Sequence, residues 1–265
     1  MKKRVLVNGA CGRMGQEVVK TIVLERDDLL VGVCDQVNIG RNLMDLLGLE
    51  AEELIIKGDL RQLIEETRPD VIIDFTTPTV VMDNIRIGLA SGVDMIVGTT
   101  GITEVDLESI DKLARENKAN ILIAPNFALG AVLMMRFAAE AAKYIYDVEI
   151  IELHHDQKLD SPSGTAIKTA ELIKQNRKEM RVIEQEEIEK ITGARGADAE
   201  GIKIHSVRLP GLVAHQEVIF GAEGQSLSIR HDSYNRKSFM PGVKLALDKI
   251  DQISGLVYGL EHLLA

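Results

Sequence analysis

Residues 152–166, with the sequence ELHHDQKLDSPSGTA, bring proton-transferring and anion-binding side chains into one short segment. The segment contains His154 and His155, and histidine is the side chain best suited in general to proton transfer near neutral pH. Lys158 adds a cationic amine that can pair with a carboxylate or donate a proton. This combination indicates a catalytic segment more than an ordinary polar loop, of which an isolated pair of histidines would be typical.

The end of the same segment is a turn that can bind an anion. Ser163 is placed to cap a helix over AIKTAELIKQ, and Gly164 keeps the backbone N–H groups next to Thr165 accessible. Because the N-terminus of a helix offers free N–H groups and a favourable dipole, a small carboxylate fits there. We expect an anion pocket with an acid–base group beside it.

A metal site is the alternative interpretation, since His154, His155, Asp156 and Asp160 can all act as ligands. Adjacent side chains on a strand point to opposite faces, so the two histidines would not easily share one ion. The segment also has no His-Glu-x-x-His pattern. We therefore expect no metal.

A second segment, NGACGRMG, carries Gly9, Gly12 and Gly15 between a predicted strand and a predicted helix. The first glycine allows a tight turn, the second lets the backbone approach a pyrophosphate, and the third permits close packing of the helix. The helix N-terminus then offers N–H groups to the phosphates. Between a strand and a helix, this Gly-x-x-Gly-x-x-Gly spacing predicts a dinucleotide site.

Asp35 ends the next predicted strand, about twenty residues beyond the glycines, where a carboxylate can accept from both ribose hydroxyls. Gln36 follows it instead of a cation, so a 2′-phosphate would meet a carboxylate there. Arg13 remains as a phosphate partner, which leaves NADPH open. The expected cofactor is NADH, NADPH or both, with NADH used comparably or better.

Strand and helix patterns alternate up to Phe127. Apolar runs such as VIIDF and ANILIAPNF predict buried strands, and PTVVMDNIRIGLASG predicts a helix begun by Pro78 and ended by glycine. This alternation is typical of a Rossmann-type, doubly wound parallel sheet. Ligands of such sheets bind beyond the carboxyl ends of the strands, where Gly98-Thr-Thr-Gly101 and Ala124-Pro-Asn-Phe127 lie.

The pattern changes near Pro125-Asn126. A helix over ALGAVLMMRFAAEAAKYI is followed by strand runs with partly alternating polarity, which indicates a smaller α+β domain with an open, mostly antiparallel or mixed sheet. Residues 192–201 are expected to form a mobile glycine-rich loop, and the segment SFMPGVKLALDKIDQISGLVYGLEHLL to be helical. The expected domains are 1–126 with 237–265, and 127–236.

Composition excludes several classes of protein. The chain has 265 residues, of which 45% are hydrophobic and 27% charged, as in ordinary globular proteins. Its net charge of −10 repels nucleic-acid phosphates. Cys11 and Cys34 form no metal-binding spacing, so a reduced, cytoplasmic protein is expected. No apolar run suggests a signal peptide or reaches the roughly 18 residues of a membrane span.

The motifs VNGACGRMG, DFTTP, VGTTG, APNF and ELHHDQKLDSPSGTA occur in this order. With them the chain resembles, over essentially its whole length, the 4-hydroxy-tetrahydrodipicolinate reductase (dihydrodipicolinate reductase) family of bacterial lysine and diaminopimelate biosynthesis. The resemblance implies a Rossmann domain, a substrate domain whose sheets assemble a homotetramer, and reduction of a cyclic dicarboxylic imine by NADH or NADPH.

The resemblance also implies roles for individual residues. His154 and Lys158 match the catalytic positions. The substrate-binding positions are matched by His155, Ser163, Gly164, Thr165 and Thr100. The cofactor-binding positions are matched by Gly9, Gly12, Arg13, Met14, Gly15, Asp35, Phe75, Thr76, Gly98, Thr99, Thr100, Ala124, Pro125, Asn126 and Phe127.

Two alternative functions compete with this one. Another two-domain NAD(P)-dependent dehydrogenase, for example one acting on a semialdehyde, would need a different substrate motif in place of HHDQKLDSPSGT. A non-catalytic NAD(H)-binding sensor would keep the glycine loop and could dispense with His154 and Lys158, so the presence of both residues argues against it.

Overall fold

The computed structural model describes residues 2–178 and 188–264. The chain forms two compact units: unit 1 comprises Met1–Phe127 and Phe239–Ala265, and unit 2 comprises Ala128–Ser238. Unit 2 is therefore inserted into the chain of unit 1. No helix of the described residues is both long and apolar enough to cross a membrane.

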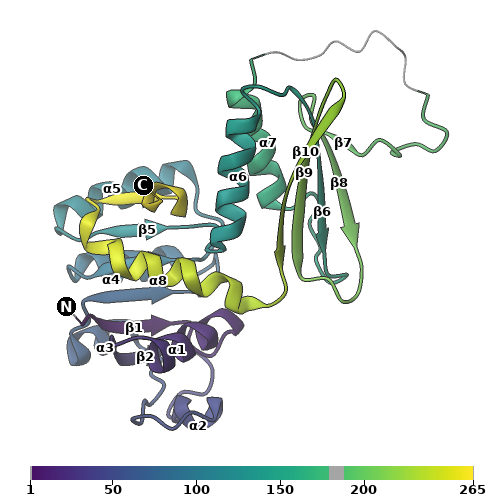
Figure 1. The fold of residues 1–265 in the computed structure, drawn as a ribbon. Helices are drawn as coiled ribbons and strands as arrows, with labels where there is room; N and C mark the ends of the chain where they lie inside the picture. The colour runs from purple at the N-terminus through teal and green to yellow at the C-terminus, as the bar shows by residue number, and fades with distance from the viewer. Residues whose placement is uncertain (1, 179–187, 265) are drawn as a thin grey trace. The chain divides into compact units, whose positions relative to one another are not determined.

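Unit 1 contains a six-stranded sheet in which every pair of neighbouring strands is parallel. Its strand order is β11-β5-β4-β3-β1-β2, so the order reverses between β1 and β3 (Figure 1). This arrangement confirms the predicted Rossmann-type sheet. The strands are β1 (Arg4–Asn8), β2 (Leu29–Cys34), β3 (Val71–Asp74), β4 (Asp94–Val97), β5 (Ile121–Ile123) and β11 (Leu256–Tyr258).

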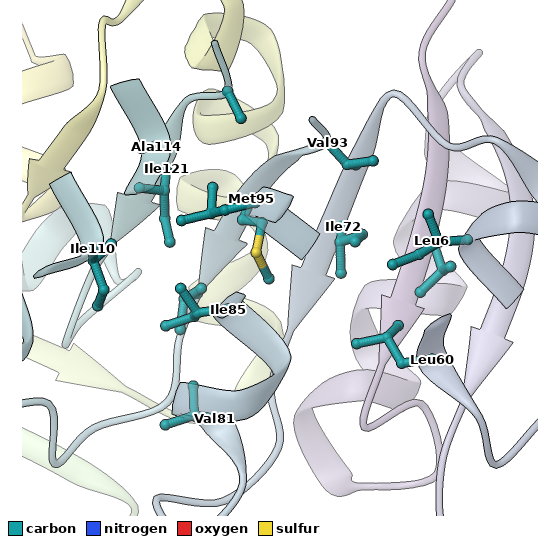
Figure 2. Close-up of a cluster of buried hydrophobic side chains, with 14 of the residues drawn as sticks. Leu6, Leu60, Ile72, Val81, Ile85, Val93, Met95, Ile110, Ala114 and Ile121 are labelled. Carbon is teal, nitrogen blue, oxygen red and sulfur yellow. The ribbon is translucent and has the colours of Figure 1, made fainter. Parts of the chain in front are cut away.

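Helices supply the apolar layers that bury this sheet. One cluster of buried side chains joins Ile72 and Met95 of the sheet to Leu60, Ile85 and Ile110 of three helices (Figure 2). Burial of each such large side chain contributes about 1.5–3 kcal/mol. The helices of unit 1 are α1 (Arg13–Glu25), α2 (Leu43–Leu47), α3 (Leu60–Thr67), α4 (Val81–Ala90), α5 (Glu104–Glu116) and α8 (Met240–Lys249).

Local signals predicted some helix ends and missed others. Residues 103–106 read Thr-Glu-Val-Asp, a helix start signal that is present in the sequence, and in α5 Thr103 and Asp106 form a reciprocal capping box. The prediction that Pro78 begins α4 was wrong, since Val80 is the N-cap and the helix starts at Val81. The N–H groups of Val80 and Val81 both donate to the carbonyl of Thr77, so a turn precedes the helix.

The end of the chain differs from its prediction as a continuous helical segment. Only α8 is a regular α-helix there, and residues 256–258 form β11, which pairs with β5 and extends the sheet. Gly255 and Gly259, at φ +68° and +103°, flank this strand with backbone conformations that favour glycine. Three residues between two glycines carry no strand periodicity, which explains the error.

Unit 2 is an α+β unit with a five-stranded mixed sheet in the order β10-β9-β6-β8-β7. Strand β6 is parallel to β8 and antiparallel to β9, which confirms the predicted sheet type. Residues 192–201, predicted as a loop, contain the short strand β7. The elements are α6 (Leu129–Ala141), β6 (Asp147–His154), α7 (Gly164–Asn176), β7 (Ala197–Asp198), β8 (Lys203–Arg208), β9 (Ala214–Ala222) and β10 (Gln225–Ser233).

Helices α6 and α7 lie against one face of this sheet (Figure 1). Ile150 of β6 pairs with Ile204 of β8 and with Val218 of β9, and all three side chains are fully or almost fully buried. The next residue on each of these strands, which points to the opposite face of the sheet, is only partly buried, as expected for a sheet with helices on one face. Glu152 follows the buried register, so a carboxylate replaces an apolar residue at the end of this core.

Candidate functional site

The glycine loop of unit 1 lies at the carboxyl end of β1, at the point where the strand order reverses. Gly9 has a φ of +78°, and its N–H donates to the carbonyl of Cys34 at the end of β2 (2.9 Å). Gly12 is the N-cap of α1 and has no side-chain cap. The first N–H groups of α1, from Arg13 and Met14, are therefore not capped by a side chain of the N-cap residue, and such groups can donate to an anion.

Two of these glycines are required by the fold itself. A Cβ on Gly15 would lie 2.0 Å from the carbonyl oxygen of Gly9, and a Cβ on Gly9 would lie 2.6 Å from the carbonyl oxygen of Phe75. Both clashes are with backbone atoms, so neither residue can be larger. A Cβ on Gly12 would meet only the Gly9 oxygen, at 3.2 Å. The fold therefore restricts Gly12 less than the other two glycines.

Asp35, at the end of β2, contacts the glycine loop directly. One carboxylate oxygen accepts from the N–H of Cys11 (2.8 Å), and the other accepts from the N–H of Val37 (3.1 Å). Each oxygen has a second lone pair, so the carboxylate can still accept from ribose hydroxyls. Arg13, the cation within the glycine segment itself, is exposed at the start of α1.

The other predicted cofactor residues of unit 1 follow the ends of neighbouring strands. Three backbone N–H groups each donate to the backbone carbonyl of a residue on the neighbouring strand: Phe75 to Asn8, Gly98 to Asp74 and Ala124 to Val97, with distances of 2.9–3.1 Å. These bonds tie successive loops together at one edge of the sheet. Thr100 and Pro125 are exposed there, whereas Ala124 is buried.

Aromatic packing adds to the order of this edge. The rings of Phe75 and Phe127 lie 5.5 Å apart at a tilted angle. A Cβ on Gly98 would lie 2.0 Å from the Phe75 ring, so Gly98 provides the space for it. Phe75, Gly98 and Phe127 thus form one packed group.

Asp74 is a residue of this edge that sequence reasoning missed. It is fully buried, and its carboxylate accepts from Asn8 and Asn84 on one oxygen and from Thr76 and Thr99 on the other. Burial raises the pKa of Asp74, and hydrogen bonds from Thr76 and the two asparagines oppose that rise. The carboxylate fixes the turn that carries Phe75 and Thr76.

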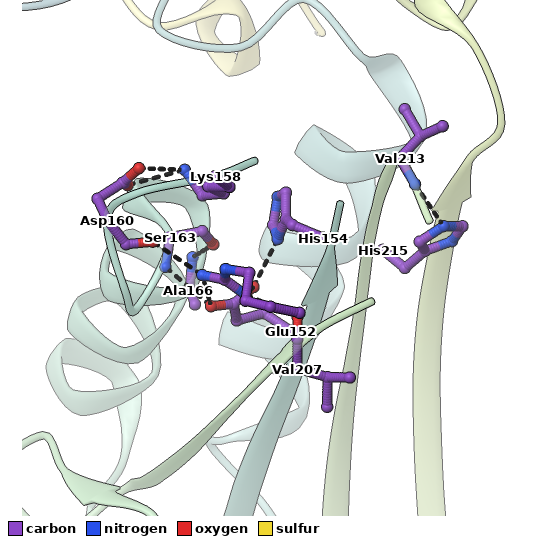
Figure 3. A network of polar contacts seen from close by, with 10 residues as sticks. Glu152, His154, Lys158, Asp160, Ser163, Ala166, Val207, Val213 and His215 are labelled. Carbon is purple, nitrogen blue, oxygen red and sulfur yellow. Dashed lines mark hydrogen bonds and ion pairs between the residues drawn. The ribbon is translucent and has the colours of Figure 1, made fainter. Parts of the chain in front are cut away.

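In unit 2 the predicted acid–base residues lie at the end of β6 and in the loop that precedes α7 (Figure 3). Nδ1 of His154 lies 2.5 Å from a carboxylate oxygen of Glu152. His155 follows the last residue of β6 and is exposed. The two histidines therefore occupy different environments, and only His154 joins the buried polar network.

Glu152 is the centre of that network, although its side chain is fully buried. Arg208 of β8 donates to both carboxylate oxygens, at 2.7 and 2.8 Å, and the backbone N–H of Ser163 donates to one of them at 3.3 Å. Burial opposes ionisation of Glu152, but the hydrogen bonds from His154 and Arg208 outweigh it and lower the pKa to about 2. Glu152 is therefore ionised at neutral pH.

Lys158 belongs to the same end of the unit through a second carboxylate. Its ammonium donates to both oxygens of Asp160, at 2.7 and 2.8 Å, and Arg208 donates to the backbone carbonyl of Asp160 at 2.8 Å. The hydrogen bond from Lys158 lowers the pKa of Asp160. Arg208 thus connects the surroundings of His154 with those of Lys158.

The predicted helix cap is confirmed at Ser163, whose hydroxyl accepts from the N–H of Ala166 (3.2 Å). Gly164 is the first residue of α7, is exposed and does not have a positive φ. A Cβ built on it would meet no atom within 4 Å. The fold has no need of glycine at this position, so the open space is available to a ligand. Thr165 follows in the first turn.

The structure thus groups the candidate residues within their own units: the dinucleotide residues in unit 1, and His154, Lys158 and the Ser163–Thr165 turn in unit 2. Among the described residues, no three His, Cys, Asp or Glu side chains gather as a metal site would require. Sequence reasoning missed Glu152 and Arg208 as site residues. The only signal in the sequence was a glutamate in the core register of β6.

Comparisons with known proteins show the family over the whole chain. The family model "Dihydrodipicolinate reductase, N-terminus" matches residues 3–127, and "Dihydrodipicolinate reductase, C-terminus" matches residues 130–264. The 4-hydroxy-tetrahydrodipicolinate reductase of Listeria welshimeri is 53% identical over 261 residues, 98% of this chain and 99% of the relative. That of Syntrophomonas wolfei is 51% identical over 263 residues, 99% of each chain.

A solved structure is similar over the same length. Dipicolinate-bound dihydrodipicolinate reductase from Paenisporosarcina sp. TG-14 has a TM-score of 0.87 and 48% identity to this chain, and 99% of each chain is covered. Both domain models, the two relatives and this structure therefore agree from one end of the chain to the other. The chain belongs to the dihydrodipicolinate reductase family.

Proposed function

We propose that this protein reduces 4-hydroxy-tetrahydrodipicolinate (dihydrodipicolinate) to tetrahydrodipicolinate with NADH or NADPH, in lysine and diaminopimelate biosynthesis. The observation that carries the proposal is the cluster at the end of β6. It combines His154 on an ionised buried carboxylate, Lys158 on Asp160, and an open helix N-terminus at Gly164. The relatives that share the whole length of the chain have the same activity in their names.

The residues of unit 1 fit a dinucleotide. We assign the pyrophosphate to the N–H groups at the start of α1 and the ribose hydroxyls to Asp35. The nicotinamide half is assigned to the loops after β3, β4 and β5. When bound, the reduced nicotinamide supplies the hydride. The lining residues proposed are Gly9, Gly12, Arg13, Met14, Gly15, Asp35, Phe75, Thr76, Gly98, Thr99, Thr100, Ala124, Pro125, Asn126 and Phe127.

The residues of unit 2 fit a small dicarboxylate. The related reductase from Paenisporosarcina binds dipicolinate, a ring with two carboxylates. We assign one carboxylate of the substrate to the turn Ser163–Thr165 and propose His155 and Thr100 as further donors. His154 and Lys158 carry the acid–base work, because both can hold or release a proton where the reduced ring must be protonated.

The direct test is a turnover assay with the full-length protein. The unstable substrate is generated in place from pyruvate and aspartate semialdehyde, and oxidation of NADH is followed by its absorbance. Consumption of NADH that depends on both precursors supports the proposal. Oxidation of NADH with aspartate semialdehyde alone would indicate the alternative dehydrogenase, and cofactor binding without any turnover would indicate a sensor.

We expect NADH to bind and to be used at least as well as NADPH. The carboxylate of Asp35 lies against the glycine loop, and Gln36 follows it in place of a cation that could neutralise a 2′-phosphate. Binding titrations and kcat/KM for both nucleotides measure the ratio. A Kd for NADPH a hundredfold below that for NADH, equivalent to about 2.7 kcal/mol, would overturn this expectation.

Gly164→Ala is expected to raise the KM for the dicarboxylate on the order of tenfold, because the new methyl group occupies space proposed for a carboxylate and hinders hydrogen bonds worth about 1.5–3 kcal/mol. Its thermal stability should be unchanged, since the Cβ meets no protein atom. Gly221→Ala on β9, where a Cβ also meets nothing, is the matched control. An unchanged KM would contradict the proposal that a substrate carboxylate binds at this turn.

A homotetramer is proposed through the face of the unit 2 sheet that α6 and α7 do not cover. Ile151, Leu153 and Ile219 lie partly exposed on that face. Ile151→Glu should therefore dissociate the assembly into smaller species, which analytical ultracentrifugation can detect. A wild-type protein that sediments as a monomer at micromolar concentration contradicts the proposal.

We place the protein in the cytoplasm, where the free thiols Cys11 and Cys34 would stay reduced.

A further inference from the structure

The buried carboxylate of Glu152 is not assigned a proton transfer in the proposed chemistry, yet it contacts three residues around the proposed site. It lies 2.5 Å from Nδ1 of His154, accepts from both terminal nitrogens of Arg208, and accepts from the N–H of Ser163. A carboxylate with no exposed surface is costly unless it is paired and hydrogen-bonded. Apolar residues fill the neighbouring core positions of β6 at Val148 and Ile150.

Ionised Glu152 fixes which nitrogen of His154 carries hydrogen. A carboxylate only accepts hydrogen bonds, so Nδ1 of His154 must be the donor. Nε2 is then the nitrogen left for a ligand, and among the described residues it has no partner. In histidines generally, the hydrogen bond made by one ring nitrogen determines the chemistry available at the other.

Arg208 links Glu152 to the loop that carries Lys158. Its bidentate contact balances the charge of Glu152 inside the unit. A further hydrogen bond, to the carbonyl of Asp160, reaches the loop that carries Lys158. The acid–base histidine, the lysine loop and the cap of α7 therefore share one buried ion pair.

We infer that Glu152 is a positioning residue of the reductase: it holds His154 as the Nδ1–H form, with Nε2 directed to the substrate, and ties that ring to the anion-binding turn at Ser163. The inference rests on the proposed function for the role of His154. It adds that the Glu152–Arg208 ion pair sets the geometry of the acid–base group and not merely the stability of unit 2.

The test compares Glu152→Gln in two backgrounds. In the wild-type background kcat should fall roughly 10- to 100-fold, the loss that is typical when the carboxylate orienting a metal-bound histidine is removed, while the Kd for NADH is unchanged. In a His154→Ala background the same substitution should lower kcat only slightly further, because the residue on which Glu152 acts is already absent. Equal losses in both backgrounds would overturn the inference.

Glu149→Gln is the matched control. Glu149 lies on the same strand and also contacts an arginine and a histidine, Arg195 at 2.5 Å and His205 at 2.8 Å, but it does not contact His154. It should leave kcat unchanged. A loss equal to that of Glu152→Gln would show a general effect of neutralising a strand carboxylate and would also overturn the inference.

A second measurement needs no variant of Glu152 and no turnover. In protein labelled with ¹⁵N-histidine, the His154 signals, assigned with His154→Ala, should show a hydrogen-bearing Nδ1, and addition of dipicolinate should shift Nε2. A neutral His154 with hydrogen on Nε2 overturns the inference even if Glu152→Gln fails to fold. If instead the tautomer is as expected but the wild type never oxidises NADH, the proposed function is wrong. Glu152 would then still fix the tautomer of His154, but not for this reaction.

Discussion

Lys158→Ala is expected to lower kcat by about 10²–10⁴-fold, the usual contribution of a positioned acid or base, with nearly unchanged affinity for NADH. The side chain is 20% exposed and is held by both oxygens of Asp160, so its loss removes a cation without opening a core. Steady-state kinetics and a separate NADH titration measure the two effects. Near-normal turnover would reject Lys158 as an acid–base residue.

Two further variants separate the roles open to this lysine. Lys158→Arg keeps a cation and its contact with a carboxylate, but an arginine does not release its proton at any ordinary pH. The kcat of Lys158→Arg should stay low if Lys158 gives up a proton, and it should return toward the wild-type value if Lys158 only pairs with the substrate. Lys168→Ala, which removes an exposed lysine of α7 that pairs with Glu171, is the control and should behave as the wild type.

Gly15→Ala is expected to weaken NADH binding roughly 10- to 100-fold and to lower the melting temperature. Its Cβ would lie 2.0 Å from the Gly9 oxygen and 2.9 Å from Cα of Ala10, so the glycine loop or α1 must move. Overpacking of this kind costs about 1–3 kcal/mol, and about 1.4 kcal/mol corresponds to tenfold in affinity. Fluorescence titration with NADH and thermal unfolding together measure the change.

Gly12→Ala provides the informative contrast. Its Cβ meets a single backbone atom at 3.2 Å, so the stability of unit 1 should change less than in Gly15→Ala. NADH binding should still weaken, because the methyl group faces the proposed pyrophosphate. If Gly12→Ala binds NADH as the wild type does, the phosphates do not approach this loop.

Periodicity and end signals predicted most of unit 1 because its strands are covered on both faces. The strand VIID is buried at all four positions, and an unbroken apolar run between polar turns marks such a strand without any alternation. The capping box of α5 is equally local: Thr103 and Asp106 are neighbours in the first turn. Features that depend on residues a few positions apart were therefore available from the sequence.

Features that depend on distant partners were not. Leu256–Tyr258 is a strand only because β5 offers a free edge, and nothing within these three residues distinguishes them from the end of a helix. Arg208 lies 56 residues from Glu152 in the chain, so the ion pair at the centre of the proposed site had no local signal. The motif identified His154 and Lys158 as a pair, whereas each is held by its own carboxylate.

The insertion of unit 2 between β5 and α8 has a consequence for biosynthesis of the protein. During translation, the ribosome must complete residues 128–238 before it makes α8 and β11. Until then β5 is an unpaired edge strand, and such edges invite pairing with other chains. The nascent cofactor unit is thus aggregation-prone while unit 2 emerges, and truncation before residue 256 would make that vulnerable state permanent.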